Sequence, residues 1–223
     1  MLLLAVDSSD KNGSIALAKC GPGEACDVLE VILLAGGTFS AQLVPQIAAL
    51  LNKHEFSKED IGAFAVVSGP GSFTGLRIGL AAVKALGEIL EKPIAAVSLL
   101  EAVAIAGKTR GRVMAALDAG RNEVYAGEYE VESGVERIDE RLVTQPELIK
   151  IAAGRTVVTP DRKLADIVRA AGLAVAGVER PGSDAIARIG WRKILSGEIV
   201  SPEMLDANYI RRMDGEIMAK NNS

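Results

Sequence analysis

The sequence predicts an α/β protein made of two lobes with similar topology. Short apolar segments typical of buried strands alternate along the chain with segments of helical periodicity. Residues 5–17, AVDSSDKNGSIAL, have a counterpart in residues 116–129, ALDAGRNEVYAGEY, about 110 residues later. A length of 223 residues with 49% hydrophobic residues is sufficient for a large buried core. We therefore expect a first lobe over residues 1–107 and a second over residues 108–223.

The first lobe is expected to begin with a hairpin. Residues 2–6 are an apolar run typical of a buried strand, a polar turn follows as far as Gly13, and residues 14–18 alternate as a second strand. Apolar periodicity and the positions of Gly and Pro predict the later elements. These are strands over 28–35, 63–68 and 94–97, and helices over 40–53, 75–92 and 99–106. Pro45 is placed near the first turn of its helix, where proline is tolerated.

The second lobe is expected to repeat the opening hairpin. Its first strand covers 113–117, and Asp118 ends that strand as Asp7 ends the first strand of the chain. Periodicity then predicts strands over 135–144, 156–159 and 173–178, helices over 146–153, 161–171 and 183–195, and an extended terminal piece over 207–213. Chance similarity of two hairpins is the alternative to a duplication.

The stretch GPGSFTGLRIG, residues 69–79, follows a buried strand and leads into a helix. Its glycines and proline allow a sharp backbone turn that leaves N–H groups exposed at the helix start, where an anion could bind. Ser72 or Thr74 could cap the helix, and Arg77 adds a positive charge in its first turn. The stretch lacks the Gly-Lys-Ser/Thr ending of a Walker loop and the spacing of a dinucleotide fingerprint. A structural turn and a phosphate site both remain open.

The helix that begins in this stretch has more apolar surface than one sheet can cover. Its charged residues fall in one stripe, and the rest of the perimeter is apolar or small. Leu76, Leu80, Val83 and Leu90 line one side, whereas Ile78, Ala82, Ala85 and Ile89 line another. A second surface must bury the remainder. It is either another helix of the same lobe or a helix of a second subunit.

Few residues are available for catalysis or metal binding. His54 is the only histidine, which excludes a pair of histidine ligands, and we interpret it as a residue at a helix end. Cys20 and Cys26 have neither CxxC nor zinc-finger spacing and are interpreted as free thiols. Asp7 and Asp118 either hold Mg²⁺ near a bound phosphate, if the two hairpins face a shared cleft, or end their strands as turn residues. No catalytic residue is expected.

The charge balance and the apolar runs restrict the partners and the location. A net charge of −4 argues against a protein that grips RNA by itself, because that task usually requires a basic face. No apolar stretch reaches the length of a membrane span, and the start MLLLAVDSSD lacks the basic region and cleavage site of a signal peptide. We expect a cytoplasmic protein without a membrane segment.

The stretch at residues 69–79 resembles the signature loop of the TsaB (YeaZ) family. Residues 5–17, residues 116–129 and the late NYIRR, residues 208–212, also resemble that family in order and spacing. The resemblance implies a two-lobed, actin-like (ribonuclease H-like) fold of the sugar kinase and Hsp70 class. One departure is Phe39, which stands before Ser40 where relatives often have His-Ser, and which we expect to pack.

The resemblance also implies a role in forming threonylcarbamoyladenosine beside the tRNA anticodon. In that family the protein is not the catalyst; it pairs with TsaD, which carries out the transfer, and the ATPase TsaE supports turnover. The implied partners are a TsaD homologue, a TsaE homologue and tRNA through the complex, and a second copy when the chain is alone. The helices over 40–53 and 76–92 match the pairing helices. The residues expected at the partner interface are Leu43, Ile47, Leu50, Ile78, Ala82, Ala85 and Ile89.

No metal is expected, and a nucleotide is expected to bind only weakly. The candidates for contacts to ATP or ADP with Mg²⁺ are Asp7, Asp118, Ser72 and Thr74, but the chain has no GG-rich adenosine loop near its end. A small actin-like ATPase or kinase is the alternative function. A glycoprotease-like metallopeptidase, an older label for this group, is disfavoured by the single histidine.

Overall fold

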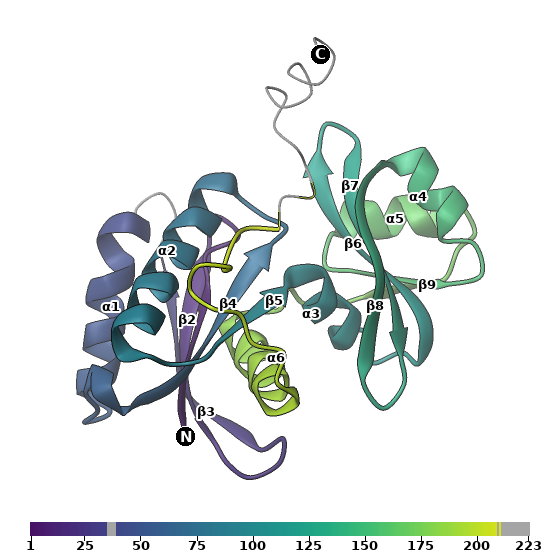
Figure 1. Ribbon diagram of the computed structural model, residues 1–223. Coiled ribbons are helices and arrows are strands. Elements are labelled where there is room, and N and C mark those ends of the chain that lie inside the picture. The colour runs from purple at the N-terminus through teal and green to yellow at the C-terminus, as the bar shows by residue number, and fades with distance from the viewer. Residues whose placement is uncertain (35–38, 209, 211–223) are drawn as a thin grey trace, which may run out of the picture. The chain divides into compact units, whose positions relative to one another are not determined.

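The structure is a computed structural model that describes residues 1–34, 39–208 and 210. The chain divides into two compact units, which are shown in Figure 1. The first unit contains Met1–Ala102 and Pro181–Ala207, and the second contains Val103–Arg180 together with Asn208–Ser223, of which residues 208 and 210 are described. Each unit is built around one five-stranded sheet.

The sheet of the first unit has the strand order β3-β2-β1-β4-β5. The central strand β1 is antiparallel to β2 and parallel to β4. β3 continues the antiparallel side and β5 the parallel side. The strands are β1 (Leu2–Asp7), β2 (Gly13–Cys20), β3 (Cys26–Leu34), β4 (Ile61–Gly69) and β5 (Ile94–Ser98).

Helices cover both faces of this sheet. In Figure 1, α1 (Phe39–Lys53) and α2 (Phe73–Leu90) lie next to each other on one face, and α6 (Ser183–Ser196) lies on the other. Because β1 is covered on both sides, all six of its residues are buried. A single 3-10 turn, Lys58–Asp60, precedes β4, and α3 (Leu99–Ala106) follows β5.

The second unit repeats the order of elements found in the first. Its sheet has the order β10-β9-β6-β7-β8, with β6 antiparallel to β7 and parallel to β9. The elements are β6 (Gly111–Gly120), β7 (Glu123–Val131), β8 (Val135–Thr144), α4 (Gln145–Ile151), β9 (Thr156–Thr159), α5 (Arg162–Ala170) and β10 (Val175–Gly177). Three antiparallel strands, a helix, a strand, a helix and a strand therefore occur in both units, which confirms the duplicated, hairpin-led lobes of an actin-like (ribonuclease H-like) fold.

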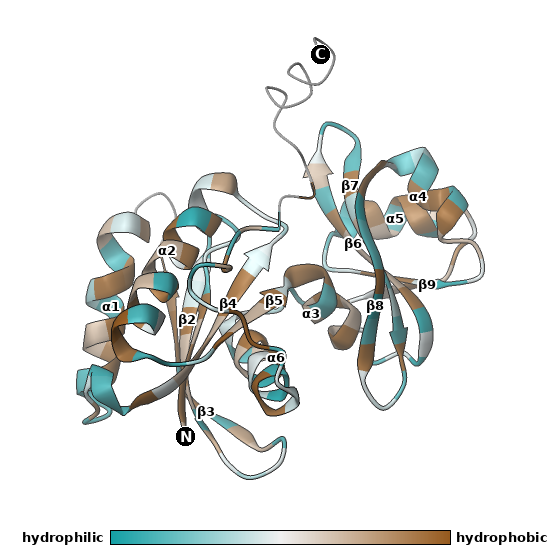
Figure 2. Ribbon diagram, in the orientation of Figure 1, coloured by the Kyte–Doolittle hydropathy of each residue, from teal (hydrophilic) through white to brown (hydrophobic). Residues whose placement is uncertain are grey.

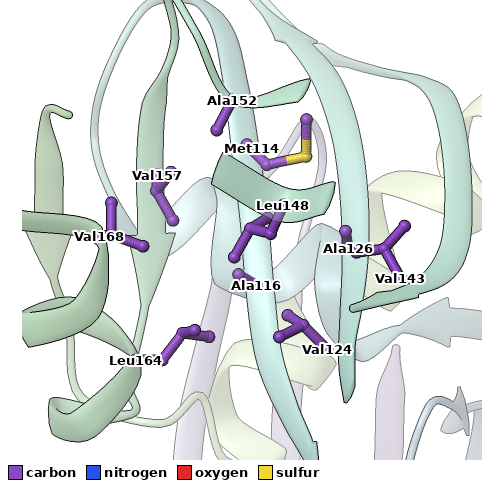
Figure 3. Packing of buried hydrophobic residues seen from close by; sticks show 10 residues of the cluster. All are labelled: Met114, Ala116, Val124, Ala126, Val143, Leu148, Ala152, Val157, Leu164 and Val168. Atoms are coloured by element: carbon purple, nitrogen blue, oxygen red, sulfur yellow. The ribbon is translucent and has the colours of Figure 1, made fainter. Parts of the chain in front are cut away.

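The core of the second unit lies between its sheet and the helices α4 and α5. Figure 3 shows this cluster, which joins side chains from β6, β7, β8 and β9 with those of the two helices. Its members are Met114, Ala116, Val124, Ala126, Val143, Leu148, Ala152, Val157, Leu164 and Val168. β8 is one of the two edge strands of this sheet and is mostly hydrophilic in Figure 2, as expected for an edge that avoids association.

The position of α6 corrects the predicted domain boundary. The sequence division at residue 107 placed all later residues in the second lobe, whereas α6 packs on the strands of the first sheet. Gly190 permits the close approach, since a Cβ there would lie 2.3 Å from the Cβ of Ala65. The reason is physical: the sheet of the first unit needs a second cover, and α6 supplies it.

Three smaller differences concern ends of elements. α2 begins at Phe73, because Ser72 caps it, and α1 begins at Phe39, so that Pro45 lies inside the helix rather than near its first turn. The predicted terminal piece over 207–213 and the late NYIRR motif lie largely outside the described residues. Among the helices of the described part of the chain, none is both long and apolar enough to cross a membrane.

Candidate functional site

The turn after β1 and the stretch 69–79 are held against each other in the first unit. Asp7 is buried, and its Oδ1 accepts hydrogen bonds from the N–H of Ser9 at 2.9 Å and from the Ser9 hydroxyl at 2.6 Å. The Ser8 hydroxyl donates to the carbonyl oxygen of Gly75 at 2.8 Å. The N–H of Ser72 donates to the carbonyl oxygen of Ser9 at 2.6 Å. Hydrogen bonds at Ser72 and at Gly75 therefore hold the stretch against the turn.

Glycines at every fourth position of the stretch allow this contact. A Cβ at Gly71 would lie 2.4 Å from the carbonyl oxygen of Ser9. A Cβ at Gly75 would lie 2.1 Å from the carbonyl oxygen of Ser8, and one at Gly79 would lie 2.2 Å from its Oγ. Real Cβ atoms do not approach other atoms so closely, so these positions need glycine for the helix to touch the turn.

Three backbone N–H groups at the start of α2 are already hydrogen-bonded within the protein. Of the two caps that the sequence allowed, Ser72 is the N-cap, and its Oγ accepts from the N–H of Gly75 at 3.3 Å. Its carbonyl oxygen accepts from the N–H of Leu76 at 2.9 Å. The amides of Ser72, Gly75 and Leu76, which could otherwise bind a phosphate at the helix start, are thus engaged within the protein. Thr74 lies exposed in the first turn. The arrangement fits a structural turn better than a phosphate cradle.

Asp118 has in the second unit the place that Asp7 has in the first. Its Oδ1 accepts a hydrogen bond from the N–H of Gly120 at 2.9 Å, two residues further on, as Asp7 does from Ser9. The N–H of Asp118 donates to Oδ2 of Asp161 at 2.8 Å. Both aspartates therefore bond to the backbone of the turn that follows them, which is the structural role weighed from the sequence.

Asp161 is a residue of this turn that the sequence analysis did not connect to Asp118. It is the N-cap of α5 and ends the connection from β9, which corresponds in the repeat to the connection from β4 to α2. Each connection contains a proline, Pro70 in the first unit and Pro160 in the second. Extending the comparison of the two halves beyond their hairpins would have pointed to this segment.

The residues expected at a partner interface fall into two groups. Leu43, Ile47 and Leu50 are at most 5% exposed and belong to the core of the first unit. In the folded chain these three side chains are therefore covered by the first unit itself and do not form part of its exposed surface. Of the α2 residues, Ile78 and Ala82 are half-buried, Ala85 is exposed and Ile89 is 72% exposed.

Apolar residues remain accessible on the outer side of α1 and α2. We call this surface the α1–α2 face, and it consists of Val44, Ala48, Ile78, Ala81, Ala82, Ala85 and Ile89. Both helices carry hydrophobic segments between hydrophilic ones in Figure 2. α1 contacts α2, so the same lobe covers part of the second apolar side of α2 but leaves Ile89 open. Val44 is 59% exposed and was not among the predicted interface residues. The rotation of α1 about its own axis decides whether Leu43 or Val44 faces the sheet, and the sequence pattern does not fix that rotation.

His54 and Phe39 both stabilise the placement of α1. Nε2 of His54 lies 2.8 Å from Oε2 of Glu30, and Nζ of Lys53 lies 2.7 Å from Oε1 of the same carboxylate. The hydrogen bonds from Lys53 and then from His54 lower the pKa of Glu30 from its ordinary value. Phe39 is buried against Gly13, where a Cβ would lie 2.9 Å from the ring. The helix-end histidine and the packed phenylalanine are as predicted.

A hollow of about 490 Å³ in the second unit has a basic lining. It is lined by Arg110, Arg112, Gly154, Arg155, Thr156, Gly172, Leu173 and Ala174. Nε and an Nη of Arg155 donate to Glu128 at 2.9 Å and 2.6 Å, and Nε of Arg112 donates to Glu130 at 3.3 Å. Two of the three guanidinium groups are thus balanced by carboxylates, which makes the hollow a weaker anion site than its arginines alone would form.

Comparison with protein families gives a match over most of the chain. The model of the TsaD family, described as tRNA N6-adenosine threonylcarbamoyltransferase, matches residues 34–175. Two curated relatives carry the name tRNA threonylcarbamoyladenosine biosynthesis protein TsaB. The Bacillus subtilis protein is 35% identical over 136 residues, which are 60% of this chain and 58% of that protein. The Escherichia coli protein is 30% identical over 224 residues, which are 95% of each chain.

Solved structures give the same result for the fold. YeaZ from Pseudomonas aeruginosa superimposes with a TM-score of 0.75 at 26% sequence identity, covering 93% of this chain and 99% of that protein. A second structure from the same organism, an uncharacterized protein with similarity to peptidase YEAZ, has a TM-score of 0.75 at 25% identity. The similarity therefore extends over both units.

Proposed function

Because the chain belongs to the TsaB (YeaZ) family, we propose that it is a non-catalytic partner that binds and activates a TsaD-like threonylcarbamoyl transferase. The reaction served is the formation of threonylcarbamoyladenosine in tRNA, which is the process named for the relatives. The observation that carries the proposal is the exposed α1–α2 face. An accessible apolar surface on a helix pair is typical of a protein-binding site.

The shape of α2 supports a helical partner on this face. Ala81, Ala85 and Ile89 recur at every fourth position and form one ridge along the exposed side of the helix. Small side chains allow the axis of a second helix to come close, and Ile89 supplies a large apolar side chain at the end of the ridge. Burial of Ile89, 72% exposed in the chain alone, would contribute favourably to association.

The polar groups of the first unit support an accessory role over a catalytic one. Asp7 holds the turn after β1, and Ser72 caps α2, so both already have structural partners. The chain contains a single histidine, which pairs with Glu30. In this proposal the transfer chemistry takes place on the partner, and the chain acts by stabilising the partner's active arrangement.

The remaining partners follow from the same proposal. A TsaE homologue and tRNA are reached through the complex, and a second copy of the chain covers the α1–α2 face when the transferase is absent. The net charge of −4 is consistent with tRNA contacts that depend on the partner. The complex is expected in the cytoplasm.

Two measurements test this function. First, a strain depleted of the protein should lose threonylcarbamoyladenosine from its tRNA, as measured by mass spectrometry of the digested nucleosides. Second, the purified chain should retain a TsaD homologue in a pull-down and raise its transfer rate with purified tRNA. A normal level of the modified nucleoside after depletion contradicts the role in the pathway. Retention without any gain in rate contradicts activation but leaves binding.

A further inference from the structure

The two cysteines of the chain are directly opposite each other at the end of the β2–β3 hairpin. The strand register pairs Cys20 with Cys26, and both are free thiols. Cys20 is 3% exposed and Cys26 is 9% exposed. They are the only cysteines in the chain. Neither takes part in the contacts of the stretch 69–79 or in the α1–α2 face.

The hydrogen bonds around this pair place it at a non-hydrogen-bonded position of the ladder. The N–H of Gly21 donates to the carbonyl oxygen of Ala25 at 2.9 Å, so the neighbouring pair is the hydrogen-bonded one. The N–H of Cys20 donates to the carbonyl oxygen of Met1 at 2.8 Å, and the carbonyl oxygen of Cys20 accepts from the N-terminal amine of Met1 at 2.7 Å. Both bonds therefore point toward β1 and away from β3. Opposite residues at such positions have Cα atoms about 4.5 Å apart and side chains on the same face.

This geometry suits a disulfide. A disulfide needs Cα atoms about 4.4–6.8 Å apart with Cβ vectors that converge. The Cα separation of about 4.5 Å at a non-hydrogen-bonded position lies at the lower end of this range, so the bond can form without movement of the backbone. We propose that Cys20 and Cys26 are a redox modification site, which closes reversibly into a cross-strand disulfide when the protein meets an oxidised low-molecular-weight disulfide such as glutathione disulfide.

The pKa values of the two thiols are shifted in opposite directions, which suits a thiol–disulfide exchange. The hydrogen bond from Cys20, followed by the charge of Arg188, lowers the pKa of Cys26, although burial opposes the shift. The same hydrogen bond together with burial raises the pKa of Cys20. Cys26 is therefore the attacking thiolate, and Cys20 is the resolving thiol.

The exchange balances in two steps. The Cys26 thiolate attacks one sulfur of glutathione disulfide, which breaks that S–S bond, forms a mixed disulfide and releases one glutathione thiolate. The Cys20 thiol transfers its proton to this thiolate and attacks the Cys26 sulfur, which forms the Cys20–Cys26 bond and releases the second glutathione. The second glutathione leaves as a thiolate and takes up the proton that Cys26 lost on ionisation, so the protein dithiol is oxidised by two electrons and glutathione disulfide is reduced to two thiols.

The bond would close the hairpin where its loop meets α6. Nε1 of Trp191 donates to the carbonyl oxygen of Gly23, in the middle of the loop, at 2.9 Å. The loop residues Pro22–Ala25 are exposed, and a local opening of this end of the hairpin would give the reagent access to Cys26. Linking the strands restricts the unfolded chain, so the oxidised first unit should melt at a higher temperature than the reduced one.

The test uses the full chain under native conditions. Reduced protein is equilibrated in glutathione buffers of increasing oxidised fraction, quenched with acid and analysed by intact mass. The expected product is a monomer that has lost two hydrogen atoms, with a peptide map that links Cys20 to Cys26, and it reverts on reduction. Trp191 is the only tryptophan and lies in the first unit, so its fluorescence follows the expected rise in melting temperature.

The variants Cys20→Ser and Cys26→Ser serve as matched controls. Neither forms the internal link, and Cys20→Ser should accumulate a glutathione adduct on Cys26 faster than Cys26→Ser does on Cys20. The chain unfolded in urea shows that the reagent is competent to link the two thiols. The proposal is overturned if the native protein keeps both thiols in fully oxidised buffer while the unfolded chain links them. Glutathione adducts or linked dimers without the internal bond would overturn it equally.

Discussion

Gly75 has the closest neighbour of the three glycines that touch the turn after β1, since a Cβ there would lie 2.1 Å from the backbone carbonyl oxygen of Ser8. Backbone atoms do not move aside as flexible side chains do. Gly75→Ala is therefore expected to lower the free energy of unfolding of the first unit by about 1–3 kcal/mol, although alanine is the better helix former. Denaturant unfolding followed by Trp191 fluorescence measures this change.

A matched control is Gly134→Ala in the connection after β7. A Cβ there meets nothing within 4 Å, so the substitution should leave stability nearly unchanged. Equal stability of the two variants would show that the turn after β1 yields easily and that the glycines have another purpose.

The nucleotide candidates lead to a second prediction for single residues. Asp7 Oδ1 and the N–H groups of Ser72, Gly75 and Leu76 already have hydrogen-bond partners, so ATP would have to break these bonds to use them. Titration of the protein with millimolar Mg-ATP in a calorimeter should therefore release no binding heat. A saturable heat that Asp7→Asn abolishes would instead favour the actin-like ATPase or kinase function.

At the scale of single elements, the hydrogen bonds at its first turn stabilise α4. Thr144 is the N-cap, and the Glu147 carboxylate accepts hydrogen bonds from the N–H and the hydroxyl of Thr144, both at 2.8 Å. These bonds lower the pKa of Glu147 from its ordinary value of 4.5. A lowered pKa means that the stabilisation is complete above the unfolded value and is lost as the pH falls through the folded value.

Glu147→Gln tests this dependence because it keeps the shape and removes the charge. At neutral pH the variant's α4 amides should exchange with solvent faster than those of the original chain. The difference should shrink as the pH falls below 4.5, where Glu147 itself becomes neutral. If the difference in exchange rate stayed constant down to acidic pH, the charge of Glu147 would not be what stabilises the first turn of α4.

The accessible ridge of α2 carries the prediction about partner binding. Ala85→Glu and Ile89→Glu place a charge on the α1–α2 face, and each should weaken binding to a TsaD homologue by roughly tenfold or more because the charge is buried without a partner. Binding is measured by calorimetry or biolayer interferometry. The Trp191 fluorescence melt should not change, because Ala85 and Ile89 are exposed in the chain alone.

The same substitutions on α5 provide the controls. Ala170→Glu and Ile167→Glu alter exposed residues of comparable kind, Ile167 being 37% exposed, but they lie in the second unit. They should bind the partner normally. Equal losses on both helices, or loss of the first unit's folding in the α2 variants, would refute the α1–α2 face as the docking surface.

At the scale of the whole molecule, the segment Pro181–Ala207 belongs to the first unit although it follows the second in the chain, and this predicts the effect of a truncation. A chain that ends at residue 107 lacks α6, whose Ile186 and Trp191 are 0% and 5% exposed, and leaves one face of the first sheet open. It should be aggregated or bind hydrophobic dyes, and it should lack a cooperative melt by circular dichroism. Joining Met1–Ala102 to Pro181–Ala207 through a flexible linker should restore the melt.

Local patterns were sufficient for most elements of the fold. Apolar alternation placed the strands, periodicity placed the helices, and the similarity of residues 5–17 and 116–129 led to the duplicated topology that the two sheets have. These signals are carried by neighbours in the chain, which is why no tertiary information was needed. The stretch at residues 69–79 also indicated the family from the sequence alone.

Tertiary structure alone decided what the individual side chains face. The sequence could not tell that Leu43 faces the sheet and Val44 the solvent, that Gly75 touches Ser8, or that α6 closes the first unit. A periodic pattern determines that a helix has an apolar side, but the partner of that side comes from segments far away in the chain. The sequence allowed the glycines of residues 69–79 to form an anion site or a structural turn. The structure shows that they pack against the turn after β1, a contact between segments far apart in the chain.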